Sequence, residues 1–327
     1  MLARVDAASI PAGSLPRTRH VGDRVGDGLL YGLTALVSIV GVLIVFAIIW
    51  RVADGAWPAI ELFKAGFLWE NQWNVTTNTF GARDFVIGTV VTSFGAMLLA
   101  TPLSIAIGLF LSELSPPAVR APVGTLIDML AAVPSVVIGL WGIYVLAPFD
   151  ARHVQPFLHS FLGWIPIFGG DAHTESTVFT AIVVLTIMTI PITSSICREL
   201  FIGVPSELEE GSIGLGATRW EMVKTVVVPS VRGGVVAAVI LGLGRALGEA
   251  IAVTQVIGNF IPLTRSLFGP GDTIASRLAN QYQGAITNTQ IAALIYLALV
   301  LLVITFLTNY AAQRVVKRFE FQRNGGT

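Results

Sequence analysis

Six long stretches of the chain are apolar and almost free of charged side chains. Four of them contain no Asp, Glu, Lys or Arg, the third contains one charged residue and the fifth contains two. A helix needs about 20 residues to cross the hydrocarbon core of a bilayer, so each stretch is long enough to span it. The pattern predicts six transmembrane helices within residues 29–50, 85–112, 121–149, 176–197, 233–262 and 291–312.

Composition supports lipid as the environment of these helices. Only 12% of the 327 residues are charged, against about 25% in an average soluble domain, and the mean hydropathy is +0.76. Twenty basic and 20 acidic residues give no net charge, which argues against a nucleic-acid partner bound by overall basicity. The single cysteine, Cys197, excludes disulfides within the chain and a cysteine-based metal cluster. We expect a polytopic all-α membrane protein that contacts lipid and binds neither nucleic acid nor a metal ion.

The basic residues indicate the orientation of the helices. The two terminal segments and the connections on their side of the membrane contain 13 Lys and Arg residues, whereas the opposite connections contain six. Lys and Arg concentrate in cytoplasmic loops, so both termini are predicted to be cytoplasmic. The expected organisation is a cytoplasmic tail over 1–28, a six-helix transmembrane domain over 29–312 and a basic cytoplasmic tail over 313–327.

The connection between the fourth and fifth spans is 35 residues long, although a handful of residues can join adjacent helices. Three glutamates in its first part favour the start of a helix, where the helix dipole stabilises negative charge. Gly214 and Gly216 are typical of a helix end and a turn. Thr218-x-x-Glu221 matches a capping box that starts a second helix, and Pro229 is expected to interrupt that helix. This length and pattern predict a surface that is offered to a cytoplasmic partner.

Within this connection, a spaced set of acidic, small and proline residues reads Glu210-Gly211-Ser212, Gly216 and Val226-x-Val228-Pro229. The set resembles the EAA loop of type I ABC importer permeases, which reads Glu-Ala-Ala, three residues, Gly, nine residues and Ile-x-Leu-Pro. Here Gly and Ser replace the two alanines, and valines replace Ile and Leu. The resemblance implies the type I ABC importer permease fold, with residues 203–229 as its cytoplasmic coupling loop. It also implies a separate ATPase subunit that uses the ATP, with no cofactor bound by this chain. The residues assigned to ATPase coupling are Glu210, Gly211, Ser212, Gly216 and Pro229.

The fifth span carries two charges, Arg245 and Glu249, in an otherwise apolar sequence. Arg245 lies 12 residues beyond Gly233, about 18 Å along a helix, which places it near the bilayer centre. A charge there costs from about 2.5 to more than 10 kcal/mol, so it must face protein or water. Glu249 follows four residues later on the same helical face and can neutralise Arg245.

Two interpretations of Arg245 and Glu249 stay open. They could form a buried ion pair that fixes the helix register. Alternatively, Arg245 could be a cationic station for an anion, because a guanidinium donates two parallel hydrogen bonds to phosphate oxygens. The flanking Gly244 and Gly248 are spaced for close helix packing.

Three further stretches narrow the resemblance: Gly-Leu-Gly-Arg-Ala-Leu-Gly-Glu at 242–249 followed by Val-Ile-Gly-Asn, Ala-Ala-Val-Pro-Ser-Val-Val-Ile-Gly-Leu-Trp-Gly at 131–142, and Phe-Gly-Ala at 80–82. They resemble the PstC-like permeases of the phosphate-specific transport system, from about Trp73 to Phe306. The resemblance implies that Arg245 and Glu249 lie on the path of phosphate. Ser135, beside the kink expected at the preceding proline, is assigned to the same substrate pathway.

The resemblance also implies the partners and the location of the chain. A PstA-like second permease would complete a heterodimeric pore, a PstB-like ATPase dimer would bind on the cytoplasmic side, and a PstS-like phosphate-binding protein would deliver the ion from outside. The implied location is the inner membrane of a bacterial cell.

Two other classes are weighed against a permease. An enzyme is disfavoured because the chain lacks a Walker A motif, an H-E-x-x-H zinc motif and a G-x-S-x-G elbow. An ion-coupled secondary transporter could use Arg245, Glu249 and Asp128, but it needs no cytoplasmic loop of this length. Otherwise Asp128 is expected to cap or pack the third span. Physical reasoning leaves other oxyanions open, and the resemblance favours phosphate. We therefore predict a non-catalytic ABC importer permease subunit that moves inorganic phosphate into the cytoplasm.

Overall fold

The computed structural model describes residues 21–170 and 173–323 and is almost wholly helical. The chain divides into two compact units, Met1–Arg51 and Val52–Thr327. Helix α1 (Val21–Phe63) continues through the boundary between them, and the side chains of residues 26–51 are nearly all exposed. A helix that is apolar on all sides is typical of a membrane span. The predicted tail over 1–28 lies mostly outside the described residues, and the helix already begins at Val21.

The remaining regular elements belong to the second unit. In chain order they are a 3-10 turn (Lys64–Leu68), β1 (Trp73–Asn74), β2 (Thr79–Phe80), α2 (Arg83–Leu109), α3 (Pro117–Ala131), α4 (Ser135–Trp141), α5 (Ala147–Phe149), α6 (Gln155–Leu162), a 3-10 turn (Pro166–Phe168), α7 (Val178–Ile202), α8 (Ser206–Gly214), α9 (Arg219–Met222), α10 (Val228–Gly248), α11 (Ile251–Val256), α12 (Ile274–Gln281) and α13 (Asn288–Arg323). Wide π-helical turns follow α2, α4, α5 and α9.

The predicted number of spans is confirmed. Among the described residues, six helical segments are long and apolar enough to cross a membrane. They are Gly26–Leu68, Arg83–Leu114, Ser135–Leu162, Val178–Ile202, Arg219–Gly248 and Asn288–Arg314.

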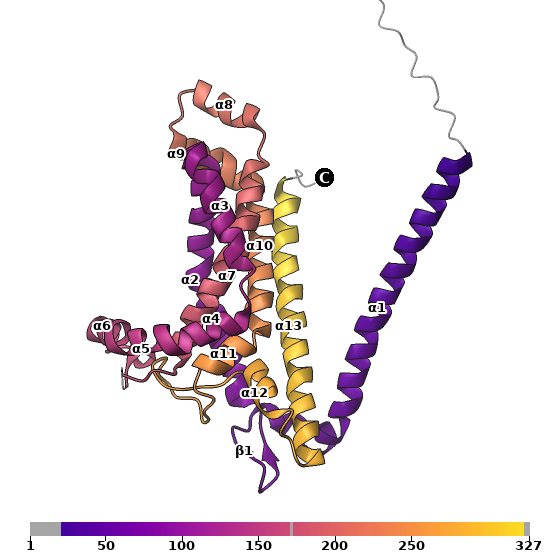
Figure 1. Cartoon of the computed structure of the whole chain (residues 1–327), viewed down its shortest axis with the longest axis vertical. Helices are drawn as coiled ribbons and strands as arrows, with labels where there is room; N and C mark the ends of the chain where they lie inside the picture. The colour runs from indigo at the N-terminus through magenta and orange to yellow at the C-terminus, as the bar shows by residue number, and fades with distance from the viewer. Residues whose placement is uncertain (1–20, 171–172, 324–327) are drawn as a thin grey trace, which may run out of the picture. The chain divides into compact units, whose positions relative to one another are not determined.

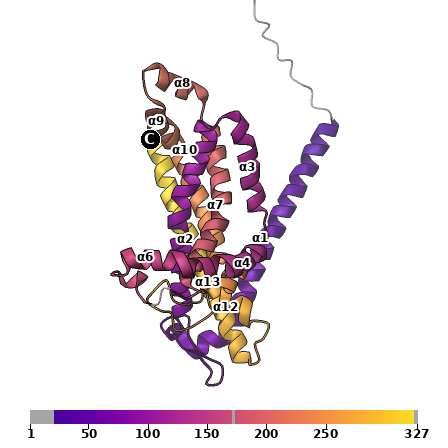
Figure 2. The same cartoon turned by 60° about the vertical axis from the view of Figure 1, so that its left-hand side comes forward.

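Small residues bring the helices of the second unit close to α7. A Cβ on Gly95 of α2 would lie 2.9 Å from Cδ1 of Ile182, and one on Gly242 of α10 would lie 2.7 Å from Oγ1 of Thr193. Lipid offers no hydrophobic drive for helices to associate, so close packing of this kind holds them together. Figures 1 and 2 show the result, in which α2, α7, α10 and α13 run side by side.

The prediction of a single helix over 121–149 is wrong. Helix α3 ends at Ala131, and α4 begins at Ser135 after a short turn. Pro134 has φ −58° and ψ 136°, and it lacks the N–H that would continue α3, so the expected kink is a full helix end. In Figures 1 and 2, α3 runs along α7, whereas α4 to α6 run across the long helices.

A buried ion pair lies near the β1–β2 hairpin, at the opposite end of the long helices from α8 (Figure 1). Nη2 of Arg277 lies 2.7 Å from Oδ2 of Asp272, and both side chains are almost fully buried. The Arg277 guanidinium also lies 4.7 Å from the ring centroid of Phe85 and 5.9 Å from that of Trp73. Burial raises the pKa of the Asp272 carboxyl, and the contact with Arg277 opposes that rise. Through its contacts with the two rings, Arg277 joins α12 to the start of α2 and to β1.

Candidate functional site

Arg245 and Glu249 lie where α10 ends. Arg245 is in the last turn of the helix, and Glu249 follows Gly248, its final residue. Nη2 of Arg245 lies 3.9 Å from Oε2 of Glu249, at the outer limit of an ion pair. The Arg245 side chain is 37% exposed, whereas that of Glu249 is 10% exposed. The predicted proximity is confirmed, but the loose contact leaves most of the five guanidinium N–H donors free for another group.

The fifth predicted span, 233–262, is not one helix. Glu249 has an extended backbone, with φ −71° and ψ 116°, and α11 begins at Ile251. Oε1 of Glu249 accepts a hydrogen bond from the backbone N–H of Ala252 at 3.3 Å. This contact satisfies one of the N–H groups that a helix start leaves unpaired, which favours the break. One carboxylate oxygen thus caps α11 while the other faces Arg245.

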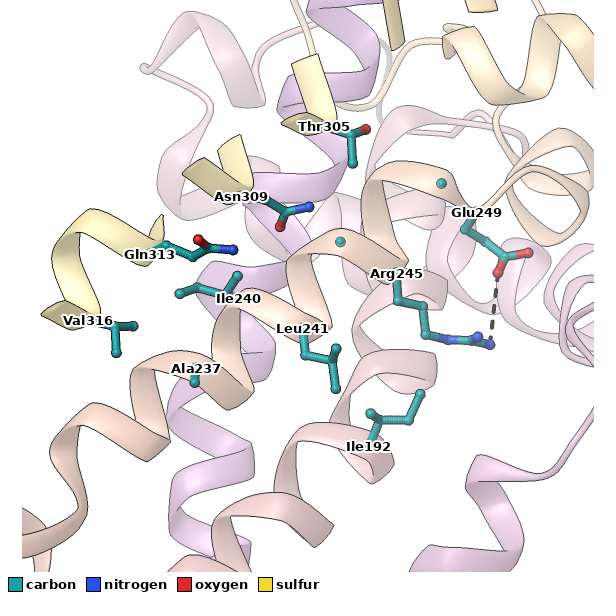
Figure 3. Close-up of a pocket in the computed structure, with 12 residues that line it drawn as sticks. Ile192, Ala237, Ile240, Leu241, Arg245, Glu249, Thr305, Asn309, Gln313 and Val316 are labelled. Carbon is teal, nitrogen blue, oxygen red and sulfur yellow. Dashed lines mark ion pairs between the residues drawn. The ribbon is translucent and has the colours of Figure 1, made fainter. Parts of the chain in front are cut away.

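Both side chains line an open cavity of about 1030 Å³. One face of α10 forms its floor, and residues of α13 and α7 flank it. Figure 3 shows Arg245 directed toward Glu249, with Ile192 of α7 nearby. Apart from these two charges, the polar lining residues are Thr305, Asn309 and Gln313 of α13.

These three α13 residues were missed by the sequence analysis, which considered charged residues inside the membrane and one hydroxyl, Ser135, beside a proline. They lie at intervals of four residues in an apolar helix, a spacing that places them on one helical face. An uncharged polar stripe of this kind is the signal that could have identified them.

The packing role expected for Gly244 and Gly248 is not observed among the residues that the structure describes. A Cβ on Gly244 would meet only Oδ1 of Asn309, at 3.9 Å, and one on Gly248 would meet nothing within 4 Å. Both glycines line the cavity and keep its floor free of side chains. The close approach to α7 comes instead from Gly242, which lies two residues before Gly244 and therefore on another face of the helix.

Ser135 and Asp128 lie away from this cavity. Ser135 is half-buried at the first position of α4 and is not among the residues that line the cavity, so its pathway role stays a prediction. Asp128 accepts a hydrogen bond from Ser195 Oγ at 2.9 Å, and its other oxygen lies 3.4 Å from Nη2 of Arg198. It lies late in α3 and does not cap the helix start, but it does pack, because it joins α3 to α7.

Residues that could bind a metal ion are scattered. In the parts of the chain that the structure describes, no three His, Cys, Asp or Glu side chains lie close enough together to ligate one ion.

The connection between α7 and α10 forms a projecting loop, as predicted. Helix α8 has no buried residue, and Figure 1 shows it beyond the end of α7. Glu210 and Gly211 are exposed, and Ser212 is half-buried. Partial burial, followed by the nearby charges of Glu113 and Glu210, raises the pKa of Glu209. The helix therefore carries concentrated negative charge.

Large apolar side chains are exposed on the same loop. Leu208, Ile213, Leu215 and Trp220 have exposed fractions of 51%, 49%, 92% and 71%. Apolar side chains grouped with polar ones on a projecting segment are typical of a protein–protein contact surface.

The predicted turn and second helix are also observed. Gly216 has φ +92°, a left-handed conformation that glycine adopts without strain. Thr218 Oγ1 accepts from the N–H of Glu221, and the Glu221 carboxylate accepts from the N–H of Thr218 at 2.8 Å. This reciprocal capping box fixes the start of α9.

The expected interruption at Pro229 is wrong. Helix α9 passes through the π-helical turn Val223–Val227 directly into α10, and Pro229 lies in the first turn of α10. Proline has no N–H with which to continue the α-helical hydrogen bonds, but the wider π-helical turn before it does not require that bond. The helical path therefore continues. Pro229 thus connects the projecting loop to the helix that carries Arg245.

Comparison with known proteins gives consistent relatives. Residues 104–320 match the family described as binding-protein-dependent transport system inner membrane component. The chain is 39% identical to the phosphate transport system permease protein PstC of Pasteurella multocida over 93% of this chain and 95% of that protein. It is 38% identical to the PstC protein of Mesorhizobium japonicum over 90% of this chain and 91% of the relative.

Two solved structures are similar in fold. A bacterial alginate ABC transporter, solved with a periplasmic protein that holds an alginate pentasaccharide, gives a TM-score of 0.59 at 20% identity and covers 90% of this chain and 98% of its own. The inward-facing MetNI methionine ABC transporter gives a TM-score of 0.51 at 18% identity over 71% of this chain and 93% of its own. At these identities the likeness concerns the fold alone.

Proposed function

We propose that this chain, which belongs to the PstC phosphate transport permeases, carries inorganic phosphate across the membrane into the cytoplasm. These permeases are among the inner membrane components of binding-protein-dependent transport systems, the family that residues 104–320 match. The fold is the predicted all-α permease fold of type I ABC importers, with six membrane helices. The family is one of transporter permeases, so ABC-type partners supply the driving force.

The observation that carries this proposal is the setting of Arg245. Its guanidinium lies at an interior helix end, loosely paired with Glu249, and opens on the cavity between α10 and α13. A guanidinium that is only loosely paired can exchange its carboxylate partner for a phosphate oxygen. A purely structural ion pair would favour a short, closed contact like that of Arg277 with Asp272.

The coupling loop completes the proposal. Helix α8 and the turn at Gly216 would bind a PstB-like ATPase dimer, which hydrolyses ATP, while this chain itself binds no cofactor. Because Pro229 joins the loop directly to α10, a displacement of α8 can reach Arg245 along one helical path. A PstA-like second permease and a PstS-like binding protein complete the importer, and both termini of this chain lie in the cytoplasm of a bacterial cell. Ser135 stays assigned to the pathway as a secondary site.

A reconstituted complex tests the function. Proteoliposomes containing this chain, its second permease and the ATPase, supplied with the binding protein, should hydrolyse ATP faster when phosphate is added. They should also accumulate labelled phosphate. Stimulation by sulfate and not by phosphate would assign another oxyanion. Undiminished phosphate accumulation after inactivation of the ATPase would indicate a secondary transporter instead.

A further inference from the structure

A polar stripe runs along α13 beside the candidate anion station. Thr305, Asn309 and Gln313 all line the cavity that holds Arg245 and Glu249. Figure 3 shows the three in succession along α13, on the side of that helix that faces α10. The stripe covers about 12 Å of the helix axis, from the level of Arg245 toward the end of the molecule that carries α8.

The polar groups of this stripe are unpaired in the part of the chain that the structure describes. In residues 21–170 and 173–323, the three side chains make no hydrogen bond and no ion pair. Apart from Arg245, the α10 wall that faces them consists of alanine, isoleucine, leucine and glycine residues, and the Asn309 amide lies against the bare backbone of Gly244. A polar amide in an apolar span costs free energy unless it meets water or a ligand. The stripe therefore points to a solute that passes along this cavity.

We infer that Thr305, Asn309 and Gln313 form the release path along which the anion leaves Arg245 for the cytoplasm, with Asn309 as the specificity-determining residue. The inference rests on the proposed function. Neutral hydroxyl and amide donors bind an oxyanion more weakly than a guanidinium does. Binding sites along a transport path must bind the ion firmly enough to admit it and weakly enough to release it. A cationic site at Arg245 followed by three uncharged polar side chains meets both conditions.

The amide of Asn309 also suits a protonated oxyanion. Its N–H groups donate to bare oxygens, and its carbonyl oxygen accepts from an O–H. Phosphate near neutral pH carries both kinds of oxygen, whereas sulfate carries only acceptors. An aspartate at this position would keep the shape but repel the anion, and a leucine would keep the volume but remove every hydrogen bond.

The test compares Asn309→Asp and Asn309→Leu in the complete reconstituted complex. The matched control is Thr308→Val, one residue away on the same helix and outside the cavity lining. We expect phosphate uptake to fall about tenfold or more in Asn309→Leu and further in Asn309→Asp, because each removes a hydrogen bond to a charged ligand. Thr308→Val should stay within about twofold of the wild type. Co-purification of the ATPase and ATP hydrolysis without phosphate should be unchanged in all three.

The wild-type complex separates this inference from the proposed function. It is assayed first with phosphate and with sulfate, and the variants are then assayed with whichever anion it takes up. Wild-type uptake of neither anion would overturn both proposals. Wild-type uptake combined with unchanged uptake in both Asn309 variants would overturn the release path alone. If Asn309→Asp failed to assemble, Gln313→Glu decides, because Gln313 is exposed and its exchange leaves the packing intact; undiminished uptake there contradicts the inference.

Discussion

At the scale of single residues, the two kinds of polar group in the membrane were unequally predictable. Arg245 and Glu249 stood out because a charge in an apolar span is costly and therefore rare. Asn309 has no charge, and its importance depends on which face of α13 meets α10, which is a tertiary property. The double role of Glu249 was likewise hidden, because only the fold shows that α10 ends there and that the carboxylate caps α11.

Glu249→Gln separates the two roles of this carboxylate. The amide oxygen can still accept the Ala252 N–H, but the negative charge beside Arg245 is gone. We expect the complex to assemble normally and to bind phosphate more tightly, with KM and kcat both lowered about tenfold, or about 1.4 kcal/mol each. The measurement is the concentration dependence of phosphate uptake.

The control for this prediction is Glu249→Ala, which removes the cap as well as the charge. Loss of the cap should cost about 1 kcal/mol of stability, so the melting temperature of the complex should also fall. Unaltered KM and kcat in Glu249→Gln would contradict a role of the carboxylate charge in transport.

The buried pair of Asp272 and Arg277 gives a stability prediction. Arg277→Met leaves the Asp272 carboxylate buried without a cation, which should cost about 3–5 kcal/mol. Thermal unfolding of the purified complex should show the loss. The double variant Asp272→Asn with Arg277→Met removes both charges and should regain much of the stability. Equal melting temperatures for the wild type and Arg277→Met would show that the pair contributes little.

At the scale of elements, hydropathy identified the spans but not their interruptions. The free energy of transferring a segment into lipid is a sum over the residues of that segment, so the six spans can be predicted from the sequence alone. The breaks at Pro134 and Glu249 have local causes, but the placement of α4 and α11 after the breaks depends on contacts between residues distant in sequence. A Cβ on Gly139 of α4 would lie 2.9 Å from Cα of Ala252 in α11, and this close packing fixes both short helices after their breaks. The coupling loop was predicted almost completely, because caps and glycine turns are local.

Two glycines of the coupling loop give opposite predictions. Gly216 has φ +92°, which costs an alanine about 1–2 kcal/mol, so Gly216→Ala should reduce the ATPase that co-purifies by about fivefold or more. Gly214 belongs to α8 and a Cβ there would meet nothing within 4 Å, so Gly214→Ala should be neutral. Equal binding of the ATPase by both variants would contradict the role of the turn.

A charge reversal tests the acidic face of α8. Glu210→Lys places a cation where the proposed ATPase contact has a carboxylate, and we expect the ATPase to dissociate or its hydrolysis to uncouple from uptake. Uptake per ATP hydrolysed should fall about tenfold or more, the loss typical of a truncated charge contact at an interface. Glu207→Lys on the same exposed helix is the control for total charge. Full coupling in Glu210→Lys would exclude this contact.

At the scale of the whole molecule, one continuous segment of the chain links α8, which would bind the ATPase, to Arg245, which would bind the substrate. The segment runs from α8 through the turn at Gly216, α9 and the π-helical turn to Arg245 at the end of α10. From there the polar stripe of α13 leads back toward the α8 end. This arrangement predicts that phosphate meets Arg245 during transport.

The decisive measurement is phosphate uptake by the reconstituted complex with Arg245→Ala and with Arg245→Lys, at equal amounts of assembled ATPase in each sample. We predict that Arg245→Ala lowers uptake by at least about tenfold, since a hydrogen-bonded charge contact is lost, and that Arg245→Lys keeps only part of the activity, since an ammonium lacks the planar fork. Uptake equal to that of the wild type in both variants would contradict contact between phosphate and Arg245 and leave Arg245 as a residue of helix packing.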